Sequence, residues 1–460
     1  MRKTTLTLIL LATSALAEPL ADLPEPLADA DFPTFPPEEI ELGQLLFWDR
    51  ELSGNRNISC ATCHHPQFGT SDGLSLGVGE GGIGLGPDRT PDPANYPEQR
   101  IPRNSPALWN VGARSFTVLF ADGRIEVDPT RPTGFRTPLE DEMVSGFASL
   151  LSAQTMFPVL SNDEMAGHYE ENEVSTLVRQ GRITGADGAW AAIAARISAI
   201  PEYQARFSEV YPEIAAGRPI GFTDVSNAIA AYMSFDFRSD SAPFDAYIRG
   251  EGTLSPDAMT GMDLFYGRAG CGTCHSGALF TDMSFHAMGD PQIGPGKAER
   301  FEGHQRDTGR MKVSNRPEDA YAFRTPSLRN ITLTPPYGHA GAFAELAAYL
   351  EHHATPGSAL AEYSLDEAIL PAMEVMKPDL AAGQDQANYE GIAAAVMAEP
   401  VSLNSAEMEA IIAFLSTLED PVAKAGGRMP VPLSVPSGLP LDKGTSIFDH
   451  FCWQVALAAA

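Results

Sequence analysis

The sequence predicts a mainly α-helical protein with two similar domains in tandem. Apolar residues recur at helical spacing in several segments, and no convincing run alternates between apolar and polar residues as a half-buried strand would. The strongest observation is an internal repeat. A Gly-x-x-Leu-Phe segment precedes a Cys-x-x-Cys-His pentad in each half of the chain, and the two pentads begin 211 residues apart. Such a repeat predicts two units of related structure.

The first residues have the pattern of a secretory signal peptide. Arg2 and Lys3 precede a short apolar run, and Ala15-Leu16-Ala17 forms a small-x-small cleavage site. A membrane anchor is the alternative, but the apolar run is too short to cross a bilayer, and no other stretch reaches that length. We therefore expect a signal peptide over residues 1–17, no membrane span and a periplasmic mature protein.

The chain is strongly acidic. It has 31 basic and 60 acidic residues, and removal of residues 1–17 would leave 29 basic residues and a net charge of −31. This charge argues against nucleic acid and anionic membranes as partners. It favours a partner with a basic docking patch, such as a small electron carrier, although solubility alone would explain it equally well.

The remaining segments are expected in the following order. Residues 18–37, rich in proline and acid, form an extended arm, and a helix follows over 40–47. Residues 71–104 form a long irregular loop, a kind of segment that is usually functional or mobile. Further helices are expected over 187–247 and over 404–418, the last with Asn404 and Glu407 as a capping pair. The domains are placed at 38–247 and 248–420, with a tail at 421–460.

The pentads carry the clearest chemistry. Cys-x-x-Cys-His is the attachment signature of c-type haem. Two thiols three positions apart can add to the two vinyl groups of one porphyrin, and the next histidine reaches the iron as its proximal ligand. A zinc or redox site is the alternative for one such pair, but two pentads in an exported chain favour haem. The residues are Cys60, Cys63 and His64 in one half and Cys271, Cys274 and His275 in the other.

With these features the sequence resembles the bacterial di-haem cytochrome c peroxidase family, which includes MauG. The resemblance runs from about residue 41 to 418. Besides the pentads it rests on RNSP (103–106), FADGR (120–124), AQTMFPVLSNDEM (153–165) and FRTPSLRNITLTPPYGHAGAF (323–343). It implies two cytochrome c-like helical domains. It also implies an N-terminal haem that reacts with hydrogen peroxide and a C-terminal haem that relays electrons.

The resemblance also implies catalytic residues. The glutamine, proline and glutamate of the family correspond to Gln154, Pro158 and Glu164, with matching spacing. A carboxylate above the haem can move a proton between the two peroxide oxygens as general base and then acid, and a nearby amide can orient the peroxide. Without the resemblance, Glu164 would be interpreted as an acid at a helix start.

The open face of the first iron follows from a count of histidines. Many peroxidases of the family cap the resting N-terminal iron with a histidine from the loop after the first pentad. Here no histidine lies between His65 and His168, and His65 adjoins the proximal ligand and cannot easily reach the opposite face. We therefore expect this iron to be five-coordinate or water-bound, as in MauG.

The second iron is expected to be six-coordinate. The family position for its distal ligand lies fourteen residues after His339, which makes His353 the expected ligand. The neighbouring His352 is the obvious rival, and Met283 or Met288 would be a methionine alternative. Two imidazole ligands predict a lower reduction potential than histidine with methionine.

Other positions depart from the family or are weakly supported. The tryptophan that usually stands between the haems is replaced by Ala121, which puts the usual relay in doubt, although Trp109 or Phe120 could substitute. Ala340 stands where an aspartate usually follows the Pro-Tyr-x-His segment, and Cys452 has no assigned role.

Calcium ligands of the family correspond to Asn104, Thr334 and Pro336, although Asn104 and Thr334 are equally typical of loop caps.

The expected function is a peroxidase that reduces hydrogen peroxide to water with electrons from a small cytochrome c or a cupredoxin. One alternative is MauG-like oxidation of a protein side chain, which the absence of a capping histidine favours and the absence of the tryptophan weakens. A non-enzymatic electron-transfer cytochrome is the other alternative, and Gln154 and Glu164 argue against it.

Overall fold

The computed structural model describes residues 23–297, 304–374 and 380–444. The expected signal peptide and Cys452 therefore lie outside the described residues. Within the described ranges, no helix combines the length and apolar character needed to cross a membrane.

The described chain is mainly helical, as predicted. The helices of the first half are α1 (Pro37–Trp48), α2 (Cys60–Cys63), α3 (Leu150–Thr155), α4 (Glu173–Arg179), α5 (Ala189–Ser198), α6 (Pro201–Val210), α7 (Pro212–Ala215) and α8 (Phe222–Asp236). The next helix, α9 (Pro243–Ile248), packs through Phe244 in the core of the second half. The remaining helices are α10 (Pro256–Tyr266), α11 (Met311–Ser314), α12 (Leu346–Ala354), α13 (Pro356–Ala359), α14 (Gln386–Ala395), α15 (Ser405–Leu415) and α16 (Pro421–Ala425).

The strands are short and all their pairings are antiparallel. They are β1 (Gly82–Ile83), β2 (Thr90–Pro91), β3 (Val118–Leu119), β4 (Ile125–Val127), β5 (Phe135–Arg136), β6 (Phe285–His286) and β7 (Phe323–Arg324). They form the sheets β1–β2, β3–β4–β5 and β6–β7. Each sheet holds a loop in place through its hydrogen bonds and adds few residues to the hydrophobic core.

The predicted helical segments are present with different bounds. The stretch expected over 187–247 is divided into α5 to α9, because Pro201 and Pro212 each begin a new helix. The capping pair of α15 is present: Asn404 Oδ1 accepts a hydrogen bond from Glu407 N at 3.1 Å, and Glu407 accepts one from Asn404 N at 3.0 Å. The described part of the arm contains only a short 3₁₀ turn at Asp29–Asp31.

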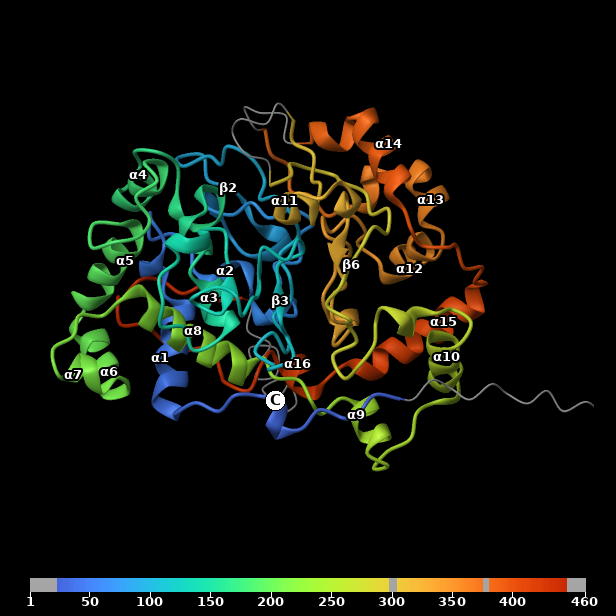
Figure 1. Cartoon of the computed structure of the whole chain (residues 1–460), viewed down its shortest axis with the longest axis horizontal. Helices are drawn as coiled ribbons and strands as arrows, with labels where there is room; N and C mark the ends of the chain where they lie inside the picture. Colours follow the sequence, from blue (N-terminus) through green and yellow to red (C-terminus); the bar gives the residue numbers. More distant parts are fainter. Residues whose placement is uncertain (1–22, 298–303, 375–379, 445–460) are drawn as a thin grey trace, which may run out of the picture.

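The two halves repeat one helix crossing. An ideal Cβ on Gly43 of α1 would lie 1.8 Å from the carbonyl oxygen of Ala228 in α8, and one on Gly261 of α10 would lie 1.9 Å from that of Ala410 in α15. Figure 1 shows the first pair in the blue and green half and the second in the yellow and red half. Each crossing is therefore close enough to require a residue without a side chain, and each occurs in the helix before a pentad.

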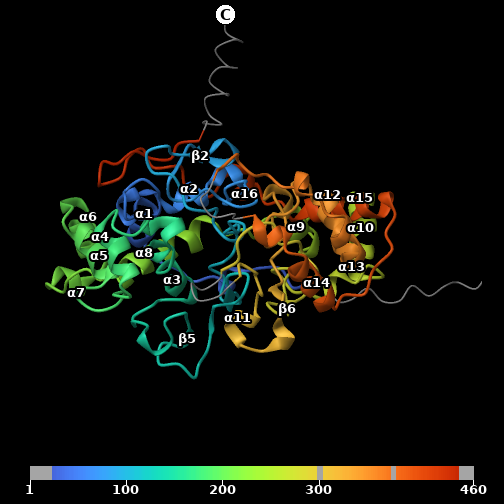
Figure 2. The same ribbon diagram turned by 90° about the horizontal axis from the view of Figure 1, so that it is seen from above.

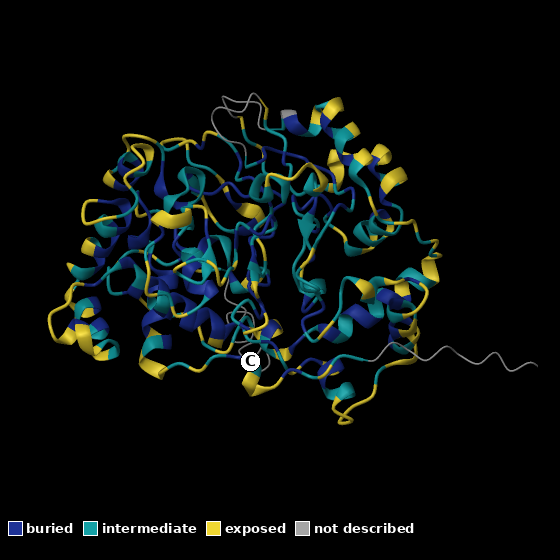
Figure 3. Cartoon of the chain, in the orientation of Figure 1, coloured by how far each residue is buried: buried dark blue, intermediate teal, exposed yellow. Residues whose placement is uncertain are grey.

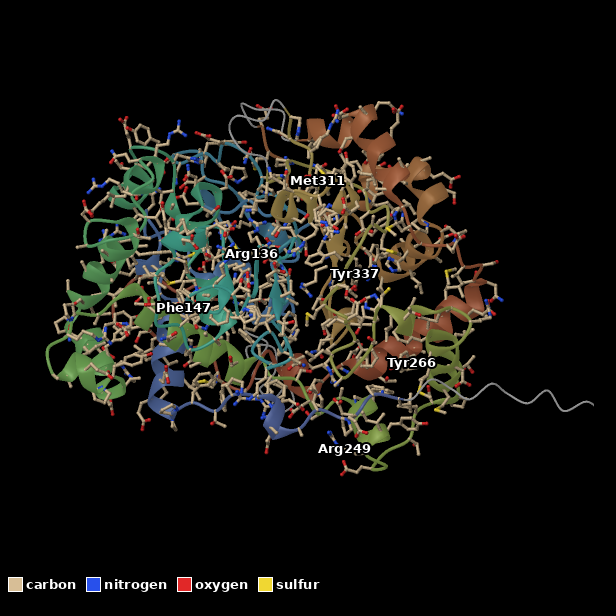
Figure 4. The ribbon with its side chains drawn as sticks, in the orientation of Figure 1. Arg136, Phe147, Arg249, Tyr266, Met311 and Tyr337 are labelled. Carbon is tan, nitrogen blue, oxygen red and sulfur yellow. The ribbon has the colours of Figure 1, made fainter. Side chains whose placement is uncertain are left out.

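Each half has its own hydrophobic core. The first contains Phe47, Trp48, Tyr232 and Phe237, and the second contains Phe265 and Phe414. Tyr266, labelled in Figure 4, packs its ring against both Phe265 and Phe414. Figure 3 shows the buried residues inside each half and the exposed ones on outer helices such as α14.

The loop over 71–104 is irregular, as predicted, but much of it is internal. Residues 71–80 are all buried. Ser75 donates a hydrogen bond from its hydroxyl to the Gly341 carbonyl and one from its backbone to the Ile369 carbonyl, at 2.5 and 3.0 Å. Leu76 joins a small boundary cluster with Ile293 and other apolar residues of the second half. The loop therefore forms part of the contact between the halves.

The end of the described chain returns to the first half. After α16, the segment over 426–444, red in Figure 1, runs back across the first half. Asp442 accepts hydrogen bonds from the hydroxyls of Ser59 and Thr62, which flank the start of α2, and pairs with Arg50 at 2.6 Å. Val435 belongs to the first core. This C-terminal strap, residues 426–444, thus packs on the first pentad.

The glycine crossings lead to a stability prediction. Gly43→Ala and Gly261→Ala should each lower the free energy of unfolding by about 1–3 kcal/mol, because the new methyl group would have to separate the helices. Gly357→Ala is the matched control, since Gly357 in α13 has no atom within 4 Å of its ideal Cβ. Denaturant titration would measure the three midpoints. Unchanged midpoints for the first two variants would show that the close crossings do not matter.

Candidate active site

The two pentad histidines are held in the same way. Each donates its backbone N–H to the carbonyl of the first cysteine of its pentad, at 2.9 Å. Nδ1 of His64 lies 3.1 Å from the Thr70 carbonyl, and Nδ1 of His275 lies 3.1 Å from the Phe280 carbonyl. A carbonyl can only accept, so Nδ1 carries the proton and Nε2 of each ring is left with a lone pair that can bind a metal.

The four pentad cysteines are free and partly buried. Burial raises the pKa of Cys60 to about 12 and that of Cys271 to about 11, and it also raises the pKa values of Cys63 and Cys274. A structural zinc site would instead need thiolates gathered around one point. Among the described residues, the only such cluster of potential ligands is Cys274, Asp282 and His286, and it includes neither pentad histidine.

His353 stands opposite His275. The ring centroids are 6.4 Å apart, and a metal with a bond of about 2 Å to a nitrogen of each ring would separate two opposed imidazole centroids by roughly 6 Å. His353 Nδ1 is buried and has no hydrogen-bond partner among the described residues. The pair of rings therefore fits a six-coordinate iron between them.

The rival ligands of the second site are engaged elsewhere. His352 Nε2 lies 3.1 Å from the Gly289 carbonyl, and the ring packs on Phe343. Consecutive residues of a helix point about 100° apart, so only one of the two histidines can face His275. The Met283 sulfur lies 3.9 Å from a guanidinium nitrogen of Arg324.

The first site has a carboxylate in its surroundings and no comparable histidine pair. Within the described residues, no ring contacts His64 as His353 contacts His275. Glu164 lies on the π-helical turn Asn162–Ala166, and its charge acts on both His64 and Cys63. Burial raises the pKa of Glu164, but the ammonium group of Lys297, 2.8 Å away, lowers it together with Arg124 and the Ser161 hydroxyl, and the net pKa lies below its usual value. Glu164 is thus ionised.

The other two catalytic candidates precede this turn. Gln154 lies in the last turn of α3, and Pro158 begins the 3₁₀ turn Pro158–Leu160 that packs on the turn of Glu164. All three side chains are partly exposed. The described hydrogen bonds include none between the Gln154 amide and Glu164, so the structure brings the three into one region without linking them directly.

A network of hydrogen bonds that the sequence did not predict holds the turn that carries Glu164. Its backbone carbonyls accept hydrogen bonds from Gly54 N at 2.8 Å, from Glu80 N at 2.9 Å and from the Asn172 amide at 2.8 Å. The Glu80 carboxylate is fully buried and accepts bonds from three asparagine amides, those of Asn55, Asn57 and Asn95. The sequence signal that could have indicated this scaffold is the pair of asparagines, Asn55 and Asn57, just before the first pentad.

Close polar contacts join the halves beside Ala121. The guanidinium of Arg103 contacts Asp122 of the first half at 2.8 Å and binds Asp307 of the second half at 2.8 and 2.9 Å. Arg324 N donates to the Ala121 carbonyl at 2.7 Å. Arg310, the residue before α11, binds both carboxylate oxygens of Glu126 in β4 at 3.0 and 2.9 Å, and Figure 2 shows β5 and α11 on the same side of the molecule.

The two candidates for an inter-haem relay lie in separate contacts. Trp109 is buried against Phe237 in the first core, with its indole N–H on the Gly69 carbonyl at 2.9 Å. The Phe120 ring lies under the Arg124 guanidinium. The ring stack at the boundary is instead Phe323 on His339, with centroids 3.8 Å apart and Arg103 over Phe323.

The residues expected to hold calcium lie at the same boundary. Asn104 N donates to the His339 carbonyl at 2.9 Å, which brings it to the segment that contains Thr334 and Pro336. The Asn104 amide donates to the Leu74 carbonyl and the Thr334 hydroxyl to the Ile331 carbonyl. Both side-chain oxygens still have lone pairs, but no carboxylate belongs to the set, and a calcium site stays a prediction.

Comparisons with known proteins agree with this arrangement. Residues 37–253 match the family model described as di-haem cytochrome c peroxidase. The methylamine utilization protein MauG of Methylorubrum extorquens is 32% identical, over 75% of this chain and 77% of that protein. Cytochrome-c peroxidase IdrP2 of Pseudomonas sp. (strain SCT) is 26% identical, over 91% and 90%. A crystal structure of a MauG-like protein associated with microbial copper homeostasis aligns over 92% of this chain and 99% of that one, with 25% identity and a TM-score of 0.56.

The boundary ion pairs lead to a prediction about pH. Burial would raise the pKa of Asp122, but Arg103 lowers it to about 2. An unfolded aspartate titrates near pH 3.9, so this contribution to stability is complete above about pH 4 and is lost as the pH falls towards 2. Arg103→Met should lower the free energy of unfolding at about pH 7 by roughly 3–5 kcal/mol, since two buried carboxylates lose their partner, and by less at about pH 3.

Denaturant titration at both pH values would measure this difference. Arg131→Met is the control, because Arg131 lies among three acidic residues at the surface and such pairs contribute little. If Arg103→Met lowers the free energy of unfolding equally at both pH values, Arg103 is not the partner that keeps the buried carboxylates ionised.

Proposed function

The chain belongs to the di-haem cytochrome c peroxidase family, and on that premise we propose that it reduces hydrogen peroxide to water with electrons from a small redox protein. It is an oxidoreductase with haem chemistry, as its relatives are. The observation that carries the proposal is the difference between the two sites. An ionised carboxylate, Glu164, lies near the first pentad histidine, whereas a second histidine lies opposite the other.

The proposed cofactors are two haem c groups, attached through Cys60 and Cys63 and through Cys271 and Cys274. Support comes from the protonated Nδ1 of His64 and His275, which leaves Nε2 for iron, and from the ring separation that fits an iron next to His353. Bound there, the haems would supply an iron with one open position for peroxide and a second iron that stores and passes electrons.

The chain's own part in the reaction is proton transfer and orientation. The Glu164 carboxylate would take the proton from the inner peroxide oxygen and deliver it to the outer one, which then leaves as water when the oxygen–oxygen bond breaks. The Gln154 amide would orient the peroxide, and Pro158 would line the site. Overall, one peroxide, two electrons and two protons give two waters.

We also propose that each half is a cytochrome c-like domain, over 38–247 and 248–420. The repeated glycine crossings and the equivalent hydrogen bonds of the two pentad histidines support this division. The C-terminal strap is then a piece of the tail that completes the first domain. A periplasmic location and a boundary calcium ion held by Asn104, Thr334 and Pro336 complete the proposal.

The electron donor is proposed to be a basic cytochrome c or cupredoxin, because the chain carries 60 acidic and 31 basic residues. The second candidate function is MauG-like oxidation of a protein side chain. Two observations favour it: the relative at 32% identity is MauG, and no histidine ring faces His64 within the described residues. Ala121 stands against it, since the relay of the family is a tryptophan.

Turnover with a reduced donor separates these functions. Peroxide consumption coupled to oxidation of a reduced cytochrome c is expected for the wild-type protein, and Glu164→Gln should slow it by at least about 100-fold, because the amide cannot accept the proton. Glu202→Gln, a control on the exposed side of α6, should match the wild type. Unchanged turnover in Glu164→Gln would remove this residue from the mechanism. Modification of a partner protein by peroxide without donor turnover would favour the second function.

Ligation of the two irons gives a further prediction. Electron paramagnetic resonance of the resting ferric protein should show one high-spin and one low-spin haem. His353→Gln should convert the low-spin signal to high spin, whereas His352→Gln should retain it, because His352 is bound to the Gly289 carbonyl. Two low-spin signals in the wild type would contradict an open first site, and the opposite pattern in the variants would assign His352 as the ligand.

A further inference from the structure

We propose that Lys297, supplied by the second half of the chain, is the positioning residue that fixes Glu164 as an oriented carboxylate at the first site. The inference rests on the proposed function and deepens it. It assigns a role to a residue 133 positions away from its partner, and it makes the catalytic base of one half depend on the docking of the other.

The contact is a direct ion pair. Lys297 Nζ lies 2.8 Å from Oε1 of Glu164, and the two side chains are 24% and 25% exposed. The ammonium group donates to Oε1 and, as a compact charge, holds that oxygen at a defined point. The Ser161 hydroxyl also hydrogen-bonds the carboxylate, so two contacts orient it, and its remaining lone pairs are left to accept the proton of peroxide.

The segment before Lys297 is rigidly anchored. Gln292 is buried, and its amide donates to the carbonyls of Gly294 and Gln305 at 2.9 and 2.8 Å. Gly296 N, one residue before Lys297, donates to the same Gln305 carbonyl at 2.8 Å. The position of the lysine backbone is therefore defined by the fold of the second half.

The same anchor is connected to the first half. The Gln292 side-chain oxygen accepts a hydrogen bond from Asp307 N at 2.9 Å, and the Asp307 carboxylate binds Arg103. Ile293 packs in the boundary cluster with Leu76 of the buried loop. The placement of Lys297 against Glu164 is thus a consequence of how the two halves dock.

The pair also suits the two stages of proton transfer. As a base, Glu164 must be ionised, and a neighbouring positive charge in a poorly solvated site favours the ionised form. Once protonated, the carboxyl beside an ammonium is a stronger acid than an isolated one, which favours delivery of the proton to the departing oxygen. Arg124 is the other cation whose charge acts on Glu164, and it is bound to Asp122 at 2.9 Å.

Cyanide binding tests the inference without turnover. Hydrogen cyanide loses its proton as the anion binds ferric iron, so its association rate, followed by the haem absorption spectrum, reports on the base. In the holoprotein, Lys297→Met should slow association by about 10-fold or more, and Lys297→Arg should restore most of the rate. The Glu164→Gln and Lys297→Met double variant should be no slower than Glu164→Gln alone, because the lysine acts through the carboxylate.

Lys424→Met is the matched control, since Lys424 forms an exposed ion pair with Glu419 and should not affect the rate. Wild-type association in Lys297→Met, or additive losses in the double variant, would overturn the inference while leaving the proposed function intact. A wild-type protein that binds no cyanide would overturn the proposed function itself. Thermal unfolding midpoints would show whether Lys297→Met is folded. If it is not, Lys297→Arg provides the test, because an association rate in Lys297→Arg as slow as that of Glu164→Gln would also reject the role of the lysine.

Discussion

A buried guanidinium joins the two halves at their boundary. Arg103 is shared between a carboxylate of its own half, Asp122, and one of the other half, Asp307, and all three side chains are largely removed from water. A charge in such a place is tolerated only if it is paired and hydrogen-bonded. The ring stack of Phe323 on His339 lies against the Arg103 guanidinium, and Asp307 connects it to Gln292 in the segment that carries Lys297.

The local parts of this architecture could be predicted from the sequence. The helix of Gly43, the pentads and the capped helix after Asn404 depend on residues close together in the chain, and a pattern of spacing is enough to find them. The region of Glu164 could be found by its spacing from Gln154. Its ionisation could not, because the cation that lowers its pKa comes from the other half and no pattern of spacing links the two.

Two further features show why the rest needed a structure. The loop after the first pentad is rich in glycine, a composition typical of surface loops, yet residues 71–80 are buried because they pack on the second half. The histidines at 352 and 353 differ by one position on a helix. The choice between them depends on the rotation of that helix relative to His275, and no local sequence pattern encodes such a rotation.

The C-terminal strap has a consequence for the order of assembly. Asp442 and Val435 complete the surroundings of the first pentad, although nearly the whole chain lies between them. The amino-terminal unit is therefore synthesised first but reaches its final packing only after the carboxy-terminal residues of the strap have been made. Until that stage, the first pair of thiols lacks the cover that the strap provides.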